Sequence, residues 1–406
     1  GDSLPNAVIL NPQQPNCMFK SKNLAGVGVI FYLLIATRIW LREKKHFRDF
    51  PEPKLDDLLG LVALGTIADI VPLDFNNRIL VSNGLKRIRH GVMPTGLKTL
   101  IELSNLEHQH ITCSDLGFKI APKLNAAGRL SDMKLGIQCL IEKNQDITLK
   151  FASELENLNE RRKKIELISR EEAMELISQK KHKSGYFGEV IFKSNWHQGI
   201  VGLIAGRVKD KTLKPTIAFA YQSENSNILK GSGRSIEGVH LRDVLERIDM
   251  REPGLIKAFG GHSMAVGLTL LESNLKKFES AFHKSLAEFV DDSFFSQTLE
   301  TDGELNLEKV NVKTVNELNN QVWGKEFFQP LFRDNFTIHE KKTLKNKHLK
   351  LVISPKKNIE LKLQAIWFNK PEIHSEEIST TYELSTNRWN GNEKIQIIIR
   401  EEIEID

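Results

Sequence analysis

The spacing of hydrophobic and polar positions divides the chain into a helical first part, a mixed middle part and a strand-rich last part. Residues 24–47 begin with an apolar run and end in basic residues, which predicts a buried helix whose final charges suit the helix dipole. A second helix is predicted over residues 55–68, and a strand over residues 7–10. We interpret residues 1–140 as the later part of an α/β domain.

Residues 146–181 contain neither glycine nor proline and are predicted to form one long helix. Its apolar stripe is interrupted by the sequence NERRKK at residues 159–164. A helix with a polar central turn is typical of a connection between two domains, and we take residues 141–182 as a linker. The basic run could contact a nucleic-acid backbone, although such a run is more often a solvated face.

The middle part, residues 183–296, alternates strands (189–193 and 215–221) with a loop and helix (196–211), which predicts a small α/β layer domain. Two glycine-rich segments follow, GSGRS and FGGHSMAVG, predicted as loops on either side of a short helix. Glycine allows a backbone to approach a ligand closely, and Arg234 offers a fork of donors suited to phosphate. We predict that His262 begins a helix over SMAVG, whose N-terminus favours an anion. Each segment alone is more often a tight turn; the pair favours a phosphate or nucleic-acid site.

The last part, residues 297–406, consists of short alternating strands and predicts a β-barrel or sandwich. Residues 340–370 contain nine lysines and two glutamates. Lysines such as Lys356 and Lys357, interleaved with Trp367, are the ingredients of a barrel of the OB type that binds single strands, with lysines along the backbone and aromatic rings stacked on bases. The alternative is a lysine-rich strand edge that prevents aggregation.

Composition narrows the class of protein. The chain has 406 residues, 40% of them hydrophobic and 27% charged, which is typical of a soluble protein of two or three domains. A net charge of +5 is compatible with a polyanionic partner without identifying one. Three dispersed cysteines argue against a disulfide framework and a cysteine zinc site and fit a reducing compartment, so we expect a cytoplasmic protein. The longest apolar run has 14 residues, too few to cross a bilayer.

Three positions outside the glycine-rich segments are candidates for chemistry. Asp69 lies inside a stretch, residues 59–73, that is apolar except for Thr66 and Asp69, and because burying a lone carboxylate is costly it must be paired, be part of a cap or bind a metal ion; a turn cap and a metal role are equally compatible with the sequence. Asn125 and Arg129 are surrounded by small residues, which would let a close helix contact deliver them into a cleft, or else mark an ordinary helix end. His197 and Arg207 could face the same cleft, although His197 is equally a structural contact at a helix start.

Seven motifs in this order resemble the single-strand-specific exonucleases of the DHH phosphoesterase superfamily. They are LNPQQPNC, LVALGTIADIVPL, LNAAGRLSD, WHQGIVGLIAGR, KGSGRSIEGVHLRDVLERID, AFGGHSMAVGL and RWNGNEKIQIII. The resemblance covers essentially the whole chain. It implies a partial DHH domain over residues 1–140, a linker helix over 141–182, an α/β DHH-associated domain over 183–296 and an OB domain over 297–406.

The resemblance also implies metal-assisted hydrolysis of phosphodiesters with Mn²⁺ or Mg²⁺, acting 5′ to 3′ on single-stranded DNA in repair and recombination. The superfamily's Asp-His-His triplet does not occur in the sequence, which begins without Met and enters the predicted strand at once. We therefore expect that an N-terminal segment with most metal ligands is missing, that Asp69 is a retained ligand, and that this chain has no complete catalytic set and little activity alone.

The resemblance assigns substrate contacts as well. Ser232 and Arg234 correspond to a pocket for the 5′-phosphate. The remaining contacts line the same cleft: Arg129, Arg207, Asn125, His262, Gly260 and Gly261. The implied partners are single-stranded DNA and a helicase or single-strand-binding protein, with no membrane. Two alternatives stay open, a non-catalytic single-strand-binding fragment and a small-nucleotide phosphodiesterase of the same superfamily, whose members generally lack the basic β domain.

Overall fold

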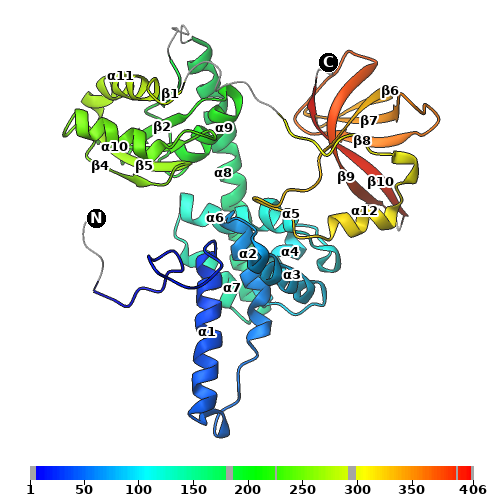
Figure 1. Ribbon diagram of the computed structural model, residues 1–406, viewed down its shortest axis with the longest axis horizontal. Coiled ribbons are helices and arrows are strands. Elements are labelled where there is room, and N and C mark those ends of the chain that lie inside the picture. The colour runs from blue at the N-terminus through cyan, green and yellow to red at the C-terminus, as the bar shows by residue number, and fades with distance from the viewer. Residues whose placement is uncertain (1–5, 180–185, 225, 291–298, 390–391, 404–406) are drawn as a thin grey trace. The chain divides into compact units, whose positions relative to one another are not determined.

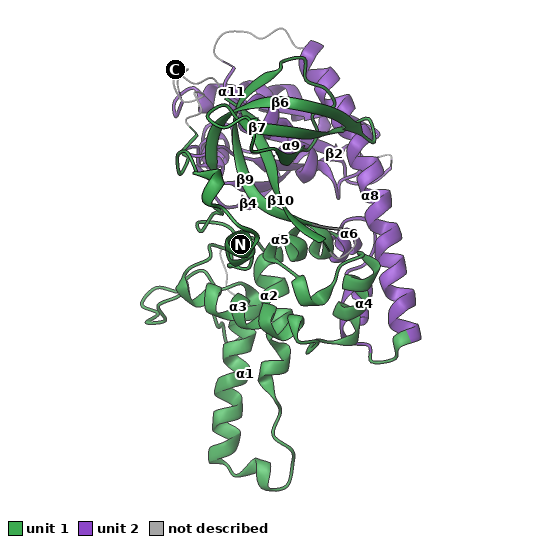
Figure 2. Ribbon diagram, turned by 90° about the vertical axis from the view of Figure 1, so that its right-hand side faces the viewer, with its two compact units in different colours: residues 1–122, 143–145, 299–406 green, residues 123–142, 146–298 purple. Residues whose placement is uncertain are grey.

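The computed structural model describes residues 6–403 apart from 180–185, 225, 291–298 and 390–391 (Figure 1). Its contacts group the chain into two compact units, coloured in Figure 2. The first unit consists of residues 1–122, 143–145 and 299–406, and the second of residues 123–142 and 146–298.

The N-terminal part of the first unit is helical. Its α-helices are α1 (Gly26–Glu43), α2 (Leu59–Ala68), α3 (Phe75–Arg89), α4 (Thr95–Leu103) and the short α5 (Cys113–Asp115). Helix α2 is extended at its start by a 3-10 turn, Leu55–Leu58, so a helix forms in both predicted segments. The expectation that the first helix is buried is wrong, because only Gly28 and Phe31 of α1 are buried and apolar residues such as Ile30 and Trp40 are exposed. The predicted strand at residues 7–10 is wrong: this segment is irregular and exposed, because no strand among the described residues pairs with it.

The C-terminal part of the first unit is a closed five-stranded barrel, which confirms the predicted β domain. Its strands are β6 (Phe332–Leu344), β7 (His348–Pro355), β8 (Leu363–Trp367), β9 (Glu377–Trp389) and β10 (Asn392–Glu402), in the order β10-β8-β7-β6-β9. Strands β8 and β10 are parallel and the other pairs antiparallel. Alternate residues such as Phe336, Leu351 and Tyr382 fill the interior, and α12 (Val312–Asn319) packs against the barrel.

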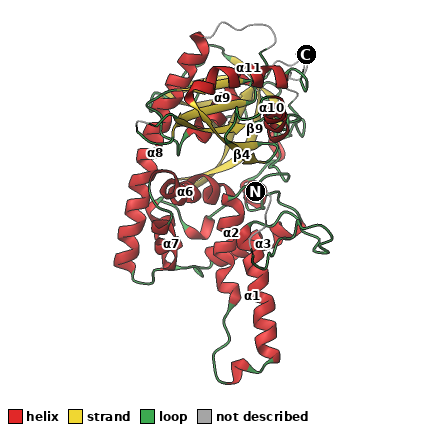
Figure 3. Cartoon of the chain, turned by 90° about the vertical axis from the view of Figure 1, so that its left-hand side faces the viewer, coloured by secondary structure: helices red, strands yellow, loops and turns green. Residues whose placement is uncertain are grey.

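The second unit begins with α6 (Ala121–Leu130) and α7 (Lys134–Ile141), followed by α8 (Gln145–Gln179), a single 35-residue helix (Figure 3). The absence of glycine and proline therefore predicted this long helix correctly. No helix in the described part of the chain is both long enough and apolar enough to cross a bilayer.

The remainder of the second unit is a five-stranded sheet between two helical layers. Its strands are β1 (Glu189–Phe192), β2 (Thr216–Tyr221), β3 (Ile228–Arg234), β5 (Ala265–Leu271) and β4 (Ala258–Gly261), in that spatial order. Helix α9 (Val201–Thr212) and the end of α8 share a core with one face. Helices α10 (Leu241–Arg251) and α11 (Leu275–Leu286) share a core with the other.

Both glycine-rich segments differ from the prediction. GSGRS is not mainly a loop, because residues 231–234 are the end of strand β3. SMAVG is not a helix, because residues 265–267 belong to β5, which pairs antiparallel with β4 as a hairpin. Alternate burial along β5 has the two-residue period of a strand, and this pattern decides the local structure although the small residues resemble a helix start.

Candidate nucleic-acid interface

Strand β3 presents Ser232 and Arg234 on the face of the sheet that α9 covers. Ser232 is opposite Ala218 of β2, which belongs to the core beneath α9. Gly202, in the first turn of α9, lies against both polar side chains. A Cβ atom at Gly202 would be 2.9 Å from Ser232 Oγ and 3.0 Å from Arg234 Nη2. The missing side chain therefore lets the start of α9 approach Ser232 and Arg234.

The glycines of GSGRS serve packing. A Cβ atom at Gly231 would lie 2.4 Å from the Phe219 ring, and one at Gly233 would lie 2.6 Å from a methyl group of Val266. Both positions point to the side of the sheet that packs against α10 and α11. The expectation that these two glycines admit a ligand is therefore replaced by a core-packing role, because neighbouring side chains already fill the space.

Arg234 is half-buried, and no described residue offers it a carboxylate partner. Its Nη1 donates to Ser232 Oγ at 3.2 Å and to the Gly233 carbonyl oxygen at 2.8 Å. Burial lowers the pKa of Arg234, and the nearby charge of Arg129 lowers it further. An anion between these two guanidinium groups would relieve both effects, and a phosphate offers acceptors that match the guanidinium fork.

Arg129 reaches the same place from helix α6. Its Nη1 donates to the carbonyl oxygen of Gly199, just before α9, at 3.3 Å. A Cβ atom at Gly199 would lie 2.0 Å from the backbone oxygen of Arg129, so α6 and the start of α9 touch through their backbones. Burial lowers the pKa of Arg129, as does the charge of Arg162, while Glu166 raises it. The glycine that allows this close contact is Gly199, whereas Gly128, next to Arg129, takes no part in it, since a Cβ atom there would meet only Met133 Sδ at 3.7 Å.

Asn125 and Arg207 lie nearer to solvent. Asn125 is exposed on α6, one turn before Arg129. Arg207, on α9, has a side chain that is 56% exposed, and its Nε donates to Glu166 Oε1 at 3.1 Å. His197 accepts a hydrogen bond from the Gly199 backbone through Nδ1 at 3.0 Å, which is the structural contact left open by the sequence.

The β4–β5 hairpin provides an open strip of backbone beside Ser232. In register, Ser232 pairs with Gly267, which pairs with Gly260. A Cβ atom at Gly260 or Gly267 would meet nothing within 4 Å. Gly261 has φ of +134° and a Cβ there would lie 2.4 Å from the Ala265 oxygen, so the hairpin itself requires this glycine. His262 is exposed at the turn, and its backbone N–H donates to Ala265.

Asp69 is exposed at the end of α2. The expectation that Asp69 is a carboxylate buried within an apolar stretch is wrong, because Asp69 is the C-cap residue of α2 and both it and the following Ile70 are exposed. Among the described residues, no three His, Cys, Asp or Glu side chains gather in a way that could hold a metal ion. Hard divalent ions take about six or more oxygen ligands, so the residues described here do not fit a two-metal centre.

The barrel residues predicted to bind single strands behave differently from one another. Trp367 is 6% exposed and belongs to the barrel core, so a base cannot stack on it as predicted; Phe368, the next residue, is 50% exposed. Lys356 and Lys357 are at the surface, where they pair with Glu377 and Glu304. Strand alternation explains the error, because adjacent residues face opposite sides and the sequence alone does not say which side is the interior.

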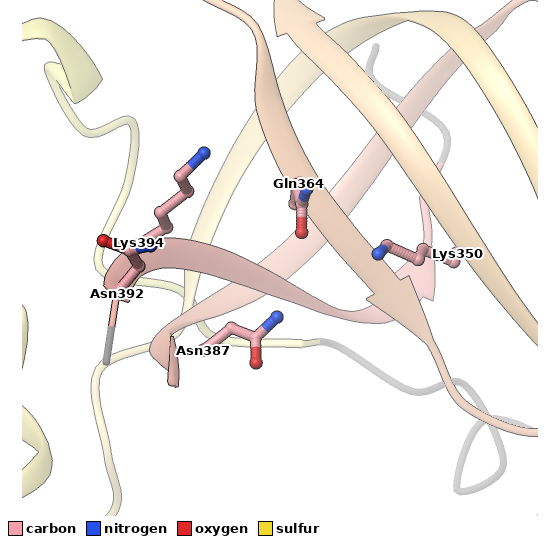
Figure 4. Close-up of a pocket in the computed structure, with 5 residues that line it drawn as sticks. All are labelled: Lys350, Gln364, Asn387, Asn392 and Lys394. Carbon is pink, nitrogen blue, oxygen red and sulfur yellow. The ribbon is translucent and has the colours of Figure 1, made fainter. Parts of the chain in front are cut away.

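The barrel surface also has a polar pocket of about 460 Å³ that sequence reasoning missed (Figure 4). It is lined by Lys350, Gln364, Asn387, Asn392 and Lys394. Lys350 and Gln364 alternate with the core residues Leu349, Leu351 and Ala365, so they lie on the outer face of β7 and β8. This alternation was the available signal. Lysine and amide side chains can bind phosphates and the polar edges of bases.

Comparison with known proteins matches both the sheet and the barrel. The DHHA1 domain model matches residues 183–288, and the RecJ OB domain model matches residues 301–401. Single-stranded-DNA-specific exonuclease RecJ of Salmonella typhimurium is 42% identical over 98% of this chain and 70% of its own length. The Bacillus subtilis protein of the same name is 31% identical over 99% of this chain and 49% of its own.

Solved structures agree on the fold. RecJ from Thermus thermophilus in complex with Mn²⁺ aligns with a TM-score of 0.78 at 24% identity, covering 100% of this chain and 57% of that one. A structure of exonuclease RecJ bound to manganese aligns with a TM-score of 0.53 at 28% identity, covering 68% of this chain and 64% of that one. Because 98% of this chain aligns with the Salmonella protein at 42% identity, and the alignment covers 70% of that protein, this chain belongs to the RecJ family of single-stranded-DNA-specific exonucleases.

Proposed function

We propose that this chain provides the strand-binding part of an exodeoxyribonuclease, a hydrolase of ester bonds that degrades single-stranded DNA from 5′ to 3′. The observation that carries the proposal is the pair of half-buried guanidinium groups, Arg129 and Arg234, for which the described residues offer no directly bonded carboxylate. A terminal 5′-phosphate bound there, with Ser232 beside it, would set the direction in which the strand enters.

Two surfaces of the protein could bind the rest of the single-stranded DNA. Gly267 and Gly260 form open backbone next to Ser232, where a nucleotide can lie without displacing a side chain. Asn125, Arg207 and His262 are exposed polar residues of the same unit, and we assign them to backbone contacts. On the barrel, the pocket around Lys350 and Lys394 is a second surface that we assign to single-strand binding.

Binding of oligonucleotides to the whole chain tests the proposal. Fluorescence anisotropy should give a higher affinity for a single strand than for a duplex, and a higher affinity for a 5′-phosphorylated strand than for its 5′-hydroxyl counterpart. Charge-assisted hydrogen bonds to the phosphate predict at least about a tenfold difference between the two ends. Equal affinity for the two ends would refute the phosphate site.

Digestion assays separate the nuclease from a single-strand-binding fragment. The relatives of solved structure are complexes with Mg²⁺ or Mn²⁺, and we propose that hydrolysis by the intact enzyme needs these ions. Asp69 alone cannot hold them, so this chain should bind single strands and release few or no nucleotides with either ion. Release of mononucleotides at the rate of an intact relative would contradict the expected inactivity and favour a complete active site.

A small-nucleotide phosphodiesterase is the weaker alternative, because the lysine-rich residues 340–370 of the barrel offer an extended strand more contacts than a dinucleotide can use. Tighter binding of a dinucleotide than of a long strand would reverse this order. We further propose a helicase or a single-strand-binding protein as the partner, since these proteins produce or cover single strands, and the cytoplasm as the location. Co-purification with either partner from cell extract tests the first of these.

A further inference from the structure

The centre of α8 carries a buried polar arrangement that the sequence predicted to be either solvated or in contact with a nucleic-acid backbone. Asn159 is 2% exposed, and the side chains of Arg162 and Glu166 are each 12% exposed. Asn159 Oδ1 accepts from Arg162 Nη2 at 3.0 Å and from its Nε at 3.3 Å. Arg162 Nη1 donates to Glu166 Oε2 at 2.7 Å. The polar turn is therefore an ordered cluster.

Glu166 links this cluster to α9. Its second oxygen, Oε1, accepts from Arg207 Nε at 3.1 Å, so each carboxylate oxygen binds a different arginine. The hydrogen bond uses Nε of Arg207, whose side chain is 56% exposed. Gly206, next to Arg207, lies along the stem of Arg234, with 3.9 Å between the Cβ position of Gly206 and Arg234 Cγ. The contact from α8 thus reaches the helix that borders the phosphate site.

The charge of Glu166 does not by itself explain why a carboxylate lies among these arginines. Arg129, Arg162, Arg207 and Arg234 lie on neighbouring elements of one unit, and Glu166 is the carboxylate that pairs with two of them. A negative charge near a phosphate site weakens the attraction for phosphate. Its benefit must come from geometry, since arginines held by a carboxylate keep one orientation and lose less side-chain entropy when phosphate binds.

We propose that Glu166 is a positioning residue of the phosphate site, fixing Arg162 and Arg207 so that the guanidinium groups around Arg129 keep the orientation that a 5′-phosphate needs. This inference rests on the proposed function. Two readings of Glu166 predict opposite outcomes. If it only supplies charge, its removal raises the affinity for all DNA ends alike. If it positions the arginines, its removal lowers the preference for a 5′-phosphate, while 5′-hydroxyl strands bind equally well or better.

The test compares Glu166→Ala, Glu166→Gln and wild type by anisotropy with 5′-phosphorylated and 5′-hydroxyl single strands. The ratio of the two affinities should fall by about fivefold to tenfold in Glu166→Ala, less than the loss of a whole charge-assisted contact would give, because the arginines remain and lose only their fixed orientation. Glu166→Gln keeps one acceptor oxygen and should lie between Glu166→Ala and wild type. The matched control is Glu160→Ala, which removes an exposed carboxylate of the same helix paired with Lys163.

Circular dichroism melting establishes that the variants are folded, and Glu166→Gln provides the answer if Glu166→Ala does not fold. An unchanged affinity ratio in the folded variants would overturn the positioning role while leaving the phosphate site intact. A wild-type chain without any preference for the 5′-phosphate would overturn both this inference and the proposed function.

Discussion

Gly202 lies directly against the guanidinium group of Arg234, and a Cβ atom at this glycine would be 3.0 Å from Arg234 Nη2. The same atom would be 2.9 Å from Ser232 Oγ. Neither contact can be accommodated without moving a polar side chain. The close approach of α9 to β3 is therefore what gives Arg234 its place, and this relationship makes the site testable without removing any charge.

Substitution of Gly202 by alanine should weaken the 5′-phosphate preference while leaving the fold intact. Alanine favours a helix over glycine by up to about 1 kcal/mol, so the melting temperature should stay the same or rise. Displacement of Arg234 should lower the affinity ratio of phosphorylated to hydroxyl ends severalfold. Gly206→Ala is the control, since its Cβ atom would make only an ordinary contact of 3.9 Å. Equal ratios in both variants would argue against this placement of Arg234.

A glycine of the sheet that packs against side chains and one that lies beside open space should respond differently to substitution by alanine. At Gly231 the new methyl group would meet the Phe219 ring at 2.4 Å and Leu268 at 2.7 Å, so overpacking should cost about 1–3 kcal/mol of unfolding free energy. At Gly267 nothing lies within 4 Å, and stability should be unchanged or slightly raised. Urea unfolding measures both. A loss of stability in Gly267→Ala larger than in Gly231→Ala would refute this division.

Salt dependence should report the ionic contact at Arg234. For single strands, the slope of log affinity against log salt changes by about 0.7 for each phosphate contact. Arg234→Ala should reduce the slope by about that amount with phosphorylated DNA. Arg251→Ala should not, because Arg251 is on α10, on the other face of the sheet, and pairs with Glu288. Identical slopes in wild type and Arg234→Ala would exclude a direct phosphate contact.

Asp334 in the barrel should make stability depend on pH. Burial raises the pKa of Asp334 above its ordinary value of 3.8. The folded protein then holds this proton more tightly than the unfolded chain does, so stability should fall as the pH rises from about 4 through the raised pKa. Asp334→Asn keeps an acceptor for the Asn335 N–H, which bonds Asp334 Oδ1 at 2.8 Å. In urea unfolding, Asp334→Asn should therefore become more stable relative to wild type as the pH rises from 4 to 7; a relative loss of stability over this range would contradict the assigned cause.

Elements with a long, consistent pattern were predicted correctly from the sequence. Helix α8 follows from 35 residues without a helix breaker, and the barrel strands follow from their alternation. A close helix contact beside Arg129 was one of two alternatives that the sequence left open, and the glycine that allows the observed contact, Gly199, belongs to a different segment from the predicted small residues. Helix α8 and the barrel strands could be predicted because local composition and periodicity decide their secondary structure.

The errors occurred where a distant partner decides the local structure. The glycines of GSGRS resemble a ligand loop until Phe219 and Val266 are seen to occupy the space beside them. Trp367 and Phe368 are equally aromatic, and the barrel closure alone determines that Trp367 points inward. Glu166 gave no signal in the sequence, because its role depends on Arg207 of another helix, 41 positions away.

A thermodynamic cycle between Arg234→Ala and removal of the 5′-phosphate tests the central claim most directly. The four affinities, of wild type and variant for phosphorylated and hydroxyl strands, yield the coupling free energy between the guanidinium group and the terminal phosphate. A direct charge-assisted contact predicts a coupling of about 1.5–3 kcal/mol, with none in the same cycle for Arg251→Ala. Equal loss of affinity for both strands, and hence no coupling, would contradict the account.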